Sequence, residues 1–510
     1  MTAAIDWANS IIWSPVLVYL CLAVGVYFTI RTRLLQIRQI PTMIRATFKG
    51  ESSKDGVSSF QALAMSLAGR VGTGNIAGVA TAIAFGGPGA VFWMWTVAFL
   101  GSSTSFIEST LGQIYKERDK VTGEYRGGPA YYFEKAYRHT KYSGLFKVYA
   151  SIFAFATVLA CGFFLPGVQA NGIATSMQGA FPTVHPWMTA TGITILLAFI
   201  VVGGVKRIAT FASVVVPFMA IIYIVLAMIV AFVNINMLGE VINLIFSSAF
   251  GLHATFGAII GTAVEWGVKR GIYSNEAGQG TGPHAAAAAE VKHPAAQGFV
   301  QAMAVYIDTL FVCSATAFLI LSTGMYRVYE GGSADTPVLA EGPGNLAEGV
   351  TVGPAFAQSA FDTLIPGAGP IFIAVSLGFF AFTTIVAYYY MAETNLRYLT
   401  RNLQNKTLGN ALLRLLQLLI LTATVIGCVS TAGAAWALGD IGVGLMAWLN
   451  IVGILVIQKP ALQVLKDYEQ QKKQGLDPMF DPRPLGIKNA DFWETYYDVK
   501  TGAIPVQDIK

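Results

Sequence analysis

The sequence predicts an all-α integral membrane protein with about 11 transmembrane helices, and three observations lead to this prediction. Of its 510 residues, 54% are hydrophobic and only 12% are charged, whereas about 25% of the residues in a soluble domain are charged. Apolar stretches long enough to cross a bilayer recur along the chain, and Lys and Arg gather in alternate loops between them. The lipid bilayer is therefore expected to surround most of the chain.

Each predicted span is an apolar stretch of about 20 residues, which is the length needed to cross a hydrocarbon core about 30 Å thick. A mildly apolar stretch at 352–366 contains Asp362 and Pro366, so it predicts a short interfacial helix before the ninth span. The spans are expected near 11–30, 60–84, 89–113, 148–175, 187–204, 211–233, 243–266, 299–324, 368–391, 411–431 and 435–457.

Basic residues orient these spans, because cytoplasmic loops carry the excess of Lys and Arg. Basic residues follow the first, third and fifth spans, at 31–54, 116–138 and 206–207, whereas the other loops contribute mainly Arg327. We therefore expect a plasma-membrane protein with its N-terminus outside and its C-terminal tail, 459–510, in the cytoplasm. The net charge of +5 follows from this pattern and does not indicate nucleic-acid binding.

The ends of the chain and its cysteines indicate no separate chemistry. Residues Met1–Trp7 lack the basic start of a cleavable signal peptide, so the first span is expected to be retained. The polar tail has too few aromatic residues to build a core, which predicts surface structure without an independent domain. The four cysteines lie in apolar stretches without metal-ligand spacing and are expected to be packing residues: Cys21, Cys161, Cys313 and Cys428.

Ten spans remain after the first, and they divide into two sets of five. A repeat with an odd number of spans returns with the opposite orientation, so the two sets would form an inverted pair, a common transporter architecture. The expected organisation is an N-terminal helix and loop (1–58), two five-helix repeats (59–235 and 236–458) and the tail (459–510).

The strongest local signal lies in the second span, where four glycines fall between positions 68 and 78. Glycine costs about 1 kcal/mol relative to alanine inside a helix, and unwound backbone in a membrane must be buried or line a cavity. A broken helix would offer amides to a carboxylate and carbonyls to a cation. The alternative is close helix packing through Gly74 and Gly78. A dinucleotide-binding loop is excluded because no strand precedes the motif.

Three groups of residues closely resemble the alanine or glycine:cation symporter family. They are Ser59–Leu63 with Gly72–Gly78, the loop Gly127–Tyr132, and Trp266–Gly271 followed by Ser274–Gly278. The resemblance covers about 59–457 and implies a LeuT-type fold, in which the second and seventh spans are broken helices that begin two inverted repeats. It also implies sodium as the coupling ion and alanine or glycine as the substrate.

The resemblance further implies ligands at the first break. The amides around Thr73 and Gly74, with Asn75 beside them, would receive the substrate carboxylate. Paired hydroxyls in the ninth span would complete a sodium site, although threonine in a membrane helix also bonds the carbonyl four residues earlier. The implied sodium ligands are Ala68, Val71, Phe380, Thr383 and Thr384.

Two further segments are expected to contact the substrate. In the fourth span, Gln169 lies in an apolar run interrupted by proline and glycine, and its amide would bond the substrate or else bridge neighbouring helices. In the seventh span, the expected break is Phe250–Gly257, with Thr255, Phe256 and Gly257 as the contacts.

Ionisable side chains at membrane depth are costly and usually functional. Arg70, Glu108 and Asp308 are of this kind. We expect Arg70 to pair with Glu108 or Asp308, either as an inner gate or as a static ion pair. The polar stretch 271–289 is expected to be a folded inner loop.

The interrupted helices favour a secondary active transporter over other membrane proteins. A channel would show a filter segment or a ring of charges, and an enzyme would need clustered ligands that five scattered histidines do not provide. We therefore expect no enzymatic activity, but sodium-coupled symport of a small neutral amino acid by alternating access. Proton-coupled symport is the alternative, and an ion channel is less favoured.

Overall fold

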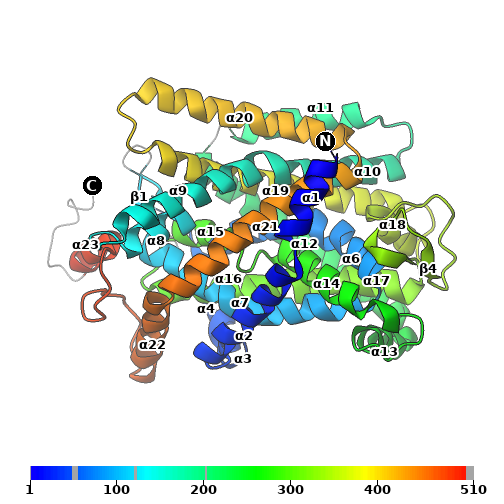
Figure 1. The fold of residues 1–510 in the computed structure, drawn as a ribbon, viewed down its shortest axis with the longest axis horizontal. Helices are drawn as coiled ribbons and strands as arrows, with labels where there is room; N and C mark the ends of the chain where they lie inside the picture. Colours follow the sequence, from blue (N-terminus) through cyan, green and yellow to red (C-terminus); the bar gives the residue numbers. More distant parts are fainter. Residues whose placement is uncertain (1, 49–55, 120–122, 202–203, 501–510) are drawn as a thin grey trace.

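The computed structural model describes residues 2–48, 56–119, 123–201 and 204–500, which form a bundle of long helices with two short hairpins at its ends (Figure 1). The long helices satisfy their own backbone groups, which is what a chain in lipid requires. Their lengths match apolar runs that can cross a bilayer. This agrees with the predicted all-α membrane protein.

The N-terminal region is a helical pair followed by two short helices. Pro15 stands at the first position of the second helix, where its missing N–H is not needed. The elements are α1 (Thr2–Ile12), α2 (Pro15–Arg31), α3 (Leu35–Arg38) and α4 (Ile40–Phe48).

The next region begins with an interrupted helix. Its first part starts at a capping box, in which the Gln61 N–H donates to Ser58 Oγ and the Ser58 N–H donates to Gln61 Oε1. Regular α-helix ends at Arg70, and a π-helical turn begins at Gly74. The elements are α5 (Ser59–Arg70), η1 (Gly74–Gly78), α6 (Val79–Gly86), α7 (Gly89–Ile114), β1 (Glu117–Arg118), β2 (Tyr125–Arg126), α8 (Pro129–Ala136), α9 (Ser143–Leu159), η2 (Ala160–Phe164), α10 (Leu165–Ala180), α11 (Pro186–Val201) and α12 (Gly204–Val233).

A second interruption at depth separates Asn275 from Gly282. Further along, α18 is the short helix predicted at 352–366. The elements are η3 (Ile235–Met237), α13 (Leu238–Ala249), η4 (Gly257–Ile259), α14 (Ile260–Asn275), α15 (Gly282–Ala288), α16 (Pro294–Val305), η5 (Tyr306–Cys313), α17 (Ser314–Thr323), β3 (Arg327–Tyr329), η6 (Glu330–Gly332), β4 (Val338–Glu341), α18 (Pro354–Asp362), α19 (Gly369–Thr400), α20 (Lys406–Val429), α21 (Ala432–Ile457), α22 (Lys459–Lys473) and α23 (Asp491–Lys500).

Eight helices of the described chain are long and apolar enough to span a membrane, so the predicted count of eleven is not confirmed. Three of the predicted spans correspond to shorter apolar helices, Gly74–Gly86, Pro186–Val201 and Ile235–Ala249. The helix predicted at 60–84 is divided by its break. The helix predicted at 243–266 is instead two helices, α13 and α14, separated by a turn at 250–256 and the short 3-10 helix η4.

Two long helices organise the interior of the bundle. Helix α7 packs against α14, α15 and α16, whereas α19 packs against α5, α10 and α12. The interrupted helix connects these two groups, because α5 contacts both α19 and α15 and α6 contacts α14. Helix α20 lies at the edge of the bundle and exposes Leu415 and Leu418 (Figure 1), as expected of a lipid-facing surface.

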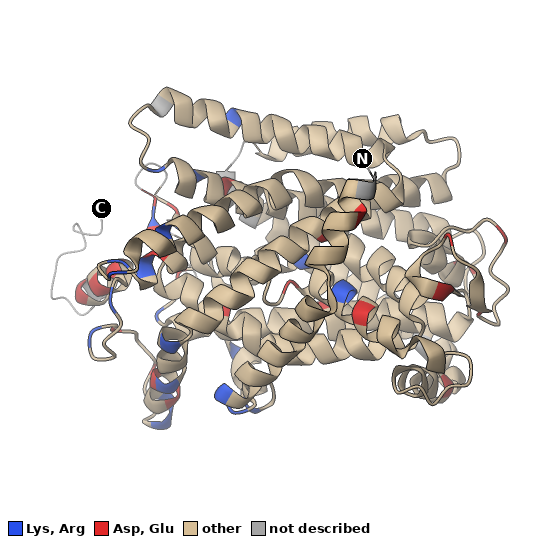
Figure 2. Ribbon diagram, in the orientation of Figure 1, with Lys and Arg blue, Asp and Glu red and all other residues tan. Residues whose placement is uncertain are grey.

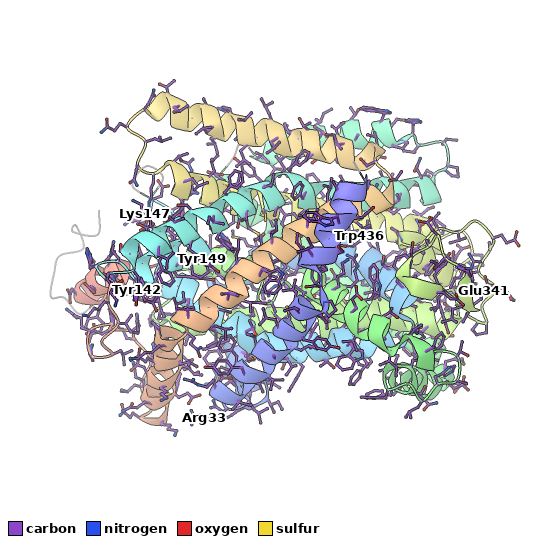
Figure 3. The ribbon with its side chains drawn as sticks, viewed as in Figure 1. Arg33, Tyr142, Lys147, Tyr149, Glu341 and Trp436 are labelled. Carbon is purple, nitrogen blue, oxygen red and sulfur yellow. The ribbon has the colours of Figure 1, made fainter. Side chains whose placement is uncertain are left out.

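Basic residues are unevenly distributed along the long axis of the molecule (Figure 2). Lys and Arg gather at the end that carries α3, α8 and α22 (Figure 2). Arg33 lies at this end and Glu341 at the opposite one (Figure 3). Arg327, the basic residue expected among acidic neighbours, pairs with Glu341 across the β3–β4 hairpin. Lys49, Lys54 and Lys120 lie outside the described residues, as do the side chains of Lys206 and Arg207.

The tail packs more closely on the bundle than its composition indicates. Phe480 and Trp493 are fully buried. The Trp493 indole N–H donates to the Gln113 carbonyl at 2.7 Å, and the Phe480 N–H donates to the Lys292 carbonyl at 3.0 Å. These aromatic side chains bury themselves against α7 and the segment before α16 and need no core of their own, a close packing that the composition of the tail did not indicate.

Candidate functional site

The first break frees two backbone amides from α-helical hydrogen bonds. Val71 is extended, with φ −79° and ψ 95°. The Gly72 N–H donates to Asn75 Oδ1 at 2.8 Å, and the Thr73 N–H donates to Gln169 Oε1 at 2.9 Å. The structure therefore brings together three residues of the predicted substrate site, Thr73, Asn75 and Gln169, and each freed amide faces an oxygen acceptor.

Two glycines of the motif have steric reasons to be glycine. A Cβ atom on Gly72 would lie 2.6 Å from Thr384 Oγ1 and 2.7 Å from Gln169 Oε1. A Cβ on Gly74 would lie 3.0 Å from the Tyr273 ring. At Gly78 the nearest atom would be 3.6 Å away, an ordinary contact. The glycine motif therefore contains a helix break and also allows close helix packing, which were the two alternative interpretations. Gly72 lets α10 and α19 approach the break, and Gly74 packs against α14.

Between α5 and α19, Thr384 Oγ1 lies among three carbonyl oxygens of the predicted sodium site, and Thr383 Oγ1 lies beside one of them. Thr384 Oγ1 lies 2.7 Å from the Ala68 carbonyl oxygen, 3.3 Å from that of Val71 and 2.9 Å from that of Phe380. Thr383 Oγ1 lies 2.8 Å from the same Phe380 oxygen. Both threonines therefore make the contacts within their own helix that were the alternative interpretation, and Thr384 also reaches the break.

This oxygen cluster fits a small hard cation. One hydroxyl has a single proton, so Thr384 can donate to only one of its three carbonyl neighbours. Because Thr383 donates to the Phe380 carbonyl, at least one of the Ala68 and Val71 carbonyl oxygens receives no hydroxyl proton. Unwound backbone carbonyls with hydroxyl oxygens are the ligands that sodium takes in transporters with broken helices.

A second buried break lies at 276–281. Glu276, Gly278 and Gly280 all have left-handed backbone, with φ of +57°, +84° and +85°. The Gly278 and Gly280 N–H groups donate to the Glu108 carboxylate at 3.2 and 3.1 Å. Every residue from 267 to 289 is buried, so the expected inner loop is instead part of the bundle interior. Its polar groups can be buried because α7 supplies Glu108 as an acceptor.

The break expected at Phe250–Gly257 is also non-helical, but it lies elsewhere. Thr255 is exposed and Leu252 is 80% exposed. Phe256 packs beside Gly87, and Gly257 beside Gly251. The structure therefore does not bring Thr255, Phe256 and Gly257 to the first break. Glycines in an apolar run indicated a break, but they do not fix its depth.

The two interrupted helices run in opposite directions side by side. At one end, the Val57 N–H donates to the Ala288 carbonyl at 3.1 Å, which joins the start of α5 to the end of α15. At the other end, a Cβ on Gly86 would lie 3.1 Å from the Thr262 carbonyl, so the end of α6 meets the start of α14. The two breaks consequently face one another.

Asp308 connects both interrupted helices through hydrogen bonds. Its carboxylate accepts from Asn75 Nδ2 at 2.6 Å, from Ser274 Oγ at 2.8 Å and from Thr309 Oγ1 at 2.7 Å. Asp308 belongs to the π-helix η5, whose wide turn carries it beside the first break. A residue predicted as a gating partner of Arg70 therefore holds Asn75 and α14 in place.

The expected ion pair between Arg70 and Glu108 or Asp308 is not formed. Arg70 donates instead to Ser105 Oγ and to the Gln301 carbonyl, both at 3.2 Å. Glu108 is occupied by two backbone amides and by Asn450 Nδ2 at 2.6 Å. Neutral donors, most of them distant in sequence, bond each carboxylate, and sequence spacing does not reveal such donors.

A buried ion pair that the sequence did not indicate lies between α14 and α21. Arg270 donates to both oxygens of Asp440 at 3.0 and 2.9 Å, and Lys269 Nζ lies 2.9 Å from Asp440. The Arg270 guanidinium also lies 4.2 Å from the centre of the Trp436 ring. In the sequence, Arg270 could be noted only as part of the motif Trp266–Gly271, because its partner Asp440 is 170 positions away.

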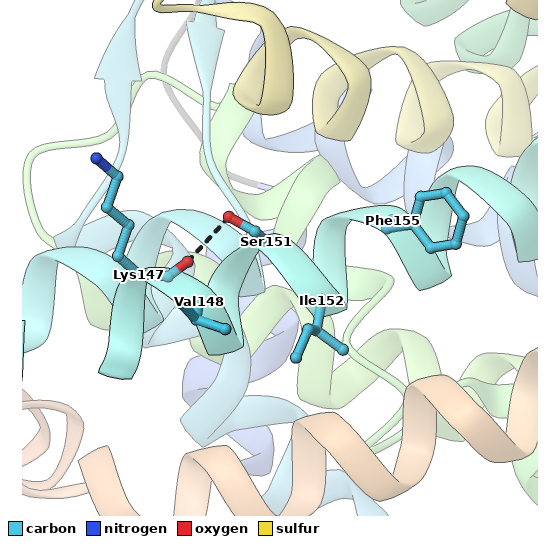
Figure 4. A pocket seen from close by; sticks show the side chains of 5 residues that line it. All are labelled: Lys147, Val148, Ser151, Ile152 and Phe155. Atoms are coloured by element: carbon cyan, nitrogen blue, oxygen red, sulfur yellow. Dashed lines mark hydrogen bonds between the residues drawn. The ribbon is translucent and has the colours of Figure 1, made fainter. Parts of the chain in front are cut away.

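A shallow surface hollow on α9 lies apart from these contacts (Figure 4). One helical face lines it, with Val148, Ile152 and Phe155 exposed and Ser151 Oγ donating to the Lys147 carbonyl at 2.9 Å. Exposed apolar side chains at this spacing are typical of a lipid-facing surface. Apart from Lys147 and Ser151, whose hydroxyl is already bonded within the helix, the lining of the hollow is apolar.

Comparison with known proteins gives an independent finding. The model of the sodium:alanine symporter family matches residues 1–482. The chain is 58% identical to a putative sodium/proton-dependent alanine carrier protein of Bacillus subtilis (strain 168), over 96% of this chain and 97% of that protein. It is 49% identical to a sodium/proton-dependent alanine carrier protein of Bacillus sp. (strain PS3), covering 89% and 98%. It is 34% identical to a sodium/alanine symporter of Methanococcus maripaludis, covering 92% and 97%.

Proposed function

The chain belongs to the sodium:alanine symporter family, and from this premise we propose that it carries alanine or glycine across the plasma membrane together with sodium, by alternating access. The family assignment makes the protein a multi-pass membrane transporter and not an enzyme. It also disfavours the ion channel considered above. Sodium as the coupling ion and the small neutral substrate are our proposals.

The observation that carries the proposal is the position of the oxygen cluster. Thr384 bonds the carbonyl of Ala68 at the end of α5, while the amide of Thr73, at the other side of the break, bonds Gln169. A cation and a carboxylate bound at this one short segment would neutralise each other's charge in a low-dielectric interior. Binding of either ligand would then order the segment for the other.

We assign the substrate site to Thr73, Gly74, Asn75 and Gln169. A substrate carboxylate can take the amides of Gly72 and Thr73 in place of the side-chain oxygens that accept from them here. Thr255, Phe256 and Gly257 are left outside the proposed site, since they lie near the exposed end of the bundle. The proposed sodium ligands remain Ala68, Val71, Phe380, Thr383 and Thr384.

The proposed architecture is a LeuT-type inverted repeat with an extra N-terminal helix. The antiparallel pairing of the two interrupted helices supports it, because helices that begin inverted repeats must run in opposite directions. The second repeat would then begin its broken helix at α14, later than the sequence suggested. The gathering of Lys and Arg around α22 supports a cytoplasmic tail and an outside N-terminus (Figure 2).

Uptake by purified protein in proteoliposomes tests the proposed function. Labelled alanine should accumulate when sodium is high outside and low inside, and should not accumulate when potassium replaces sodium. Glycine should compete for this uptake. Equal accumulation without any ion gradient, or none with one, would contradict the proposal.

Proton-coupled symport is a second candidate that two findings favour. Two relatives are named sodium/proton-dependent carriers, and a buried carboxylate at the second break, Glu276, has no basic residue in direct contact. Uptake driven by an imposed pH gradient alone would support this candidate.

A further inference from the structure

Glu276 differs from the other buried carboxylates near the two breaks. It is 0% exposed, and it caps α14 with left-handed backbone. Its Oε2 accepts one hydrogen bond, from Thr281 Oγ1 at 2.9 Å. Its Oε1 has no hydrogen-bond partner among the described residues. An ionised carboxylate held this way in the bundle interior is poorly stabilised.

The neighbouring acids are satisfied in ways that Glu276 is not. Glu108 accepts from two backbone amides and Asn450. Asp308 accepts from three side chains, and Asp440 is paired with Arg270 and Lys269. Each of these three carboxylates accepts from at least two donors. Glu276, with one, has the fewest hydrogen-bond donors of the four.

The surroundings of Glu276 are polar and incompletely bonded. Arg70 on α5 bonds Ser105 and Gln301 and leaves its Nε without a partner in the described chain. Asn275 Nδ2 and both polar atoms of the Gln279 side chain are likewise buried and unpartnered. Buried polar atoms without protein partners are groups that ordered water commonly satisfies. Such water would connect the carboxylate to solvent when the bundle opens.

The charged and ionisable groups around Glu276 set which cation it can take. Arg70 is the basic group that acts on it, and Asp308 is the acidic one. A positive guanidinium disfavours a second metal ion, which would also need several oxygen ligands where Glu276 has one hydroxyl neighbour. A proton needs a single oxygen. The other ionisable groups that face Glu276 are Tyr273 on α14, Cys161 on η2 and Tyr388 on α19.

We infer that Glu276 is a proton-binding site of the transport cycle, an inference that rests on the proposed symport function. The carboxylate takes a proton from water to become a neutral carboxyl group, and returns it to water when α15 separates from α5. The protonated form suits the packed state, because Oε1 of this buried carboxylate has no hydrogen-bond donor among the described residues. Helix α5 lies close to the carboxylate, since a Cβ on Gly69 would lie 3.4 Å from Oε2. Close packing against α5 would then favour proton loading, and opening would favour release.

Proton flux measured beside alanine uptake tests the inference. Proteoliposomes contain the full chain, a pH-sensitive dye inside, and equal sodium on both sides. Wild-type protein should acidify the interior when alanine is added outside, and its uptake should rise as the outside is made more acidic. Glu276→Gln should still exchange labelled for unlabelled alanine, but should lose the acidification and the pH dependence. Glu240→Gln, an exposed change on α13, serves as the control.

The possible outcomes distinguish failure of the proposed symport function from failure of the inference about Glu276. Absence of any ion-driven uptake by wild-type protein would contradict the proposed function itself. Normal wild-type uptake, with acidification retained by Glu276→Gln, would overturn the inference about Glu276 alone. If Glu276→Gln does not fold, Glu276→Asp provides the test, because a shorter side chain should shift the pH midpoint of uptake. An unshifted midpoint in that variant would also overturn the inference.

Discussion

The hydroxyl oxygen of Thr384 lies 2.7 Å from the Ala68 carbonyl oxygen, so α19 is joined to the last turn of α5 at the first break. The same hydroxyl lies near the carbonyls of Phe380 and Val71. Thr384 can donate to only one of these carbonyls and Thr383 donates to that of Phe380, so at least one of the Ala68 and Val71 oxygens receives no hydroxyl proton, whereas one cation could contact both. This contact connects the proposed sodium site to the backbone whose amides are proposed to bind the substrate.

Removing the Thr384 hydroxyl should weaken sodium binding more than removing that of Thr383. Thr384 reaches carbonyls on two helices, whereas Thr383 contacts only Phe380 in its own helix. Thr384→Ala should raise the sodium concentration for half-maximal uptake roughly three- to tenfold, since one such contact contributes about 0.5–1.5 kcal/mol. Thr383→Ala should raise it less. Alanine affinity at saturating sodium should change little in either variant.

The matched control for these variants is Thr394→Ala. Thr394 is buried on the same helix, and its hydroxyl bonds only the Tyr390 carbonyl within that helix. Its loss should leave sodium dependence unchanged. Equal sodium dependence in Thr384→Ala and Thr394→Ala would remove Thr384 from the ion site.

Two glycines of the motif should respond differently to an added methyl group. In Gly72→Ala the new Cβ would collide with Thr384 Oγ1 and Gln169 Oε1, at 2.6 and 2.7 Å. Overpacking costs about 1–3 kcal/mol, so alanine binding should weaken by roughly tenfold or more. Gly78→Ala meets only an ordinary contact and should bind normally. Calorimetry on the purified variants measures both.

Arg70→Gln separates amide recognition of the carboxylate from recognition by a guanidinium. Arg70 bonds Ser105 and Gln301, and it has no described contact with the amides at the break. Its loss should impair transport but leave alanine binding measurable. Lost binding in Arg70→Gln together with normal binding in Gly72→Ala would move the carboxylate site to Arg70.

Labelling with a membrane-impermeant thiol reagent tests the orientation. All four native cysteines are buried, so wild-type protein should give little background. Ala334→Cys, exposed before β4, should be labelled in intact cells. Gln474→Cys, exposed after α22, should be labelled only after the cells are opened. The opposite pattern would invert the proposed topology.

Packing of the tail on the bundle should strengthen as pH rises. Burial lowers the pKa of the Lys116 ammonium from its ordinary 10.5 to about 7. Lys116 lies 5.0 Å from the Trp493 ring centre and donates to the Ala289 carbonyl at 2.8 Å. An undocked tail would let Lys116 hold a proton up to its ordinary pKa. The undocked state therefore binds more protons between these two pH values, and docking is favoured as pH rises through that interval.

Fluorine NMR of 5-fluorotryptophan-labelled protein measures this docking. The Trp493 signal, assigned through Trp493→Phe, should move from a solvent-exposed to a buried position as pH rises from neutral. Lys116→Met keeps the apolar stem without the charge and should flatten this dependence. An unchanged pH dependence in Lys116→Met would show that another group controls docking.

The sequence alone predicted a structural feature where one short segment contained all the residues that indicate it. The glycines at 68–78 predicted the first break, and Thr384 and Gln169 both contact it. The second break was missed because Asn275–Gly282 has the composition of a loop. Its burial depends on Glu108, which is 170 positions away from Gly278. Contacts of that kind decide which polar segments can be buried, and no local pattern records them.

The same dependence on residues distant in the sequence explains why the contacts of Arg70 and the packing of the tail were not predicted. The sequence showed that Arg70 is buried in an apolar span, but not that neighbouring donors already occupy Glu108 and Asp308. It showed few aromatic residues in the tail, but not that Trp493 has a carbonyl acceptor on α7. Residue types identified the groups that need partners, and only the fold identified the partners.

The most direct test of the central claim is the affinity of purified protein for alanine as a function of sodium. If one broken segment binds both ligands, the dissociation constant of alanine should fall as sodium rises, and alanine should tighten sodium binding by the same factor. Potassium at equal ionic strength should have no such effect. Alanine affinity that is identical in sodium and in potassium would contradict the account.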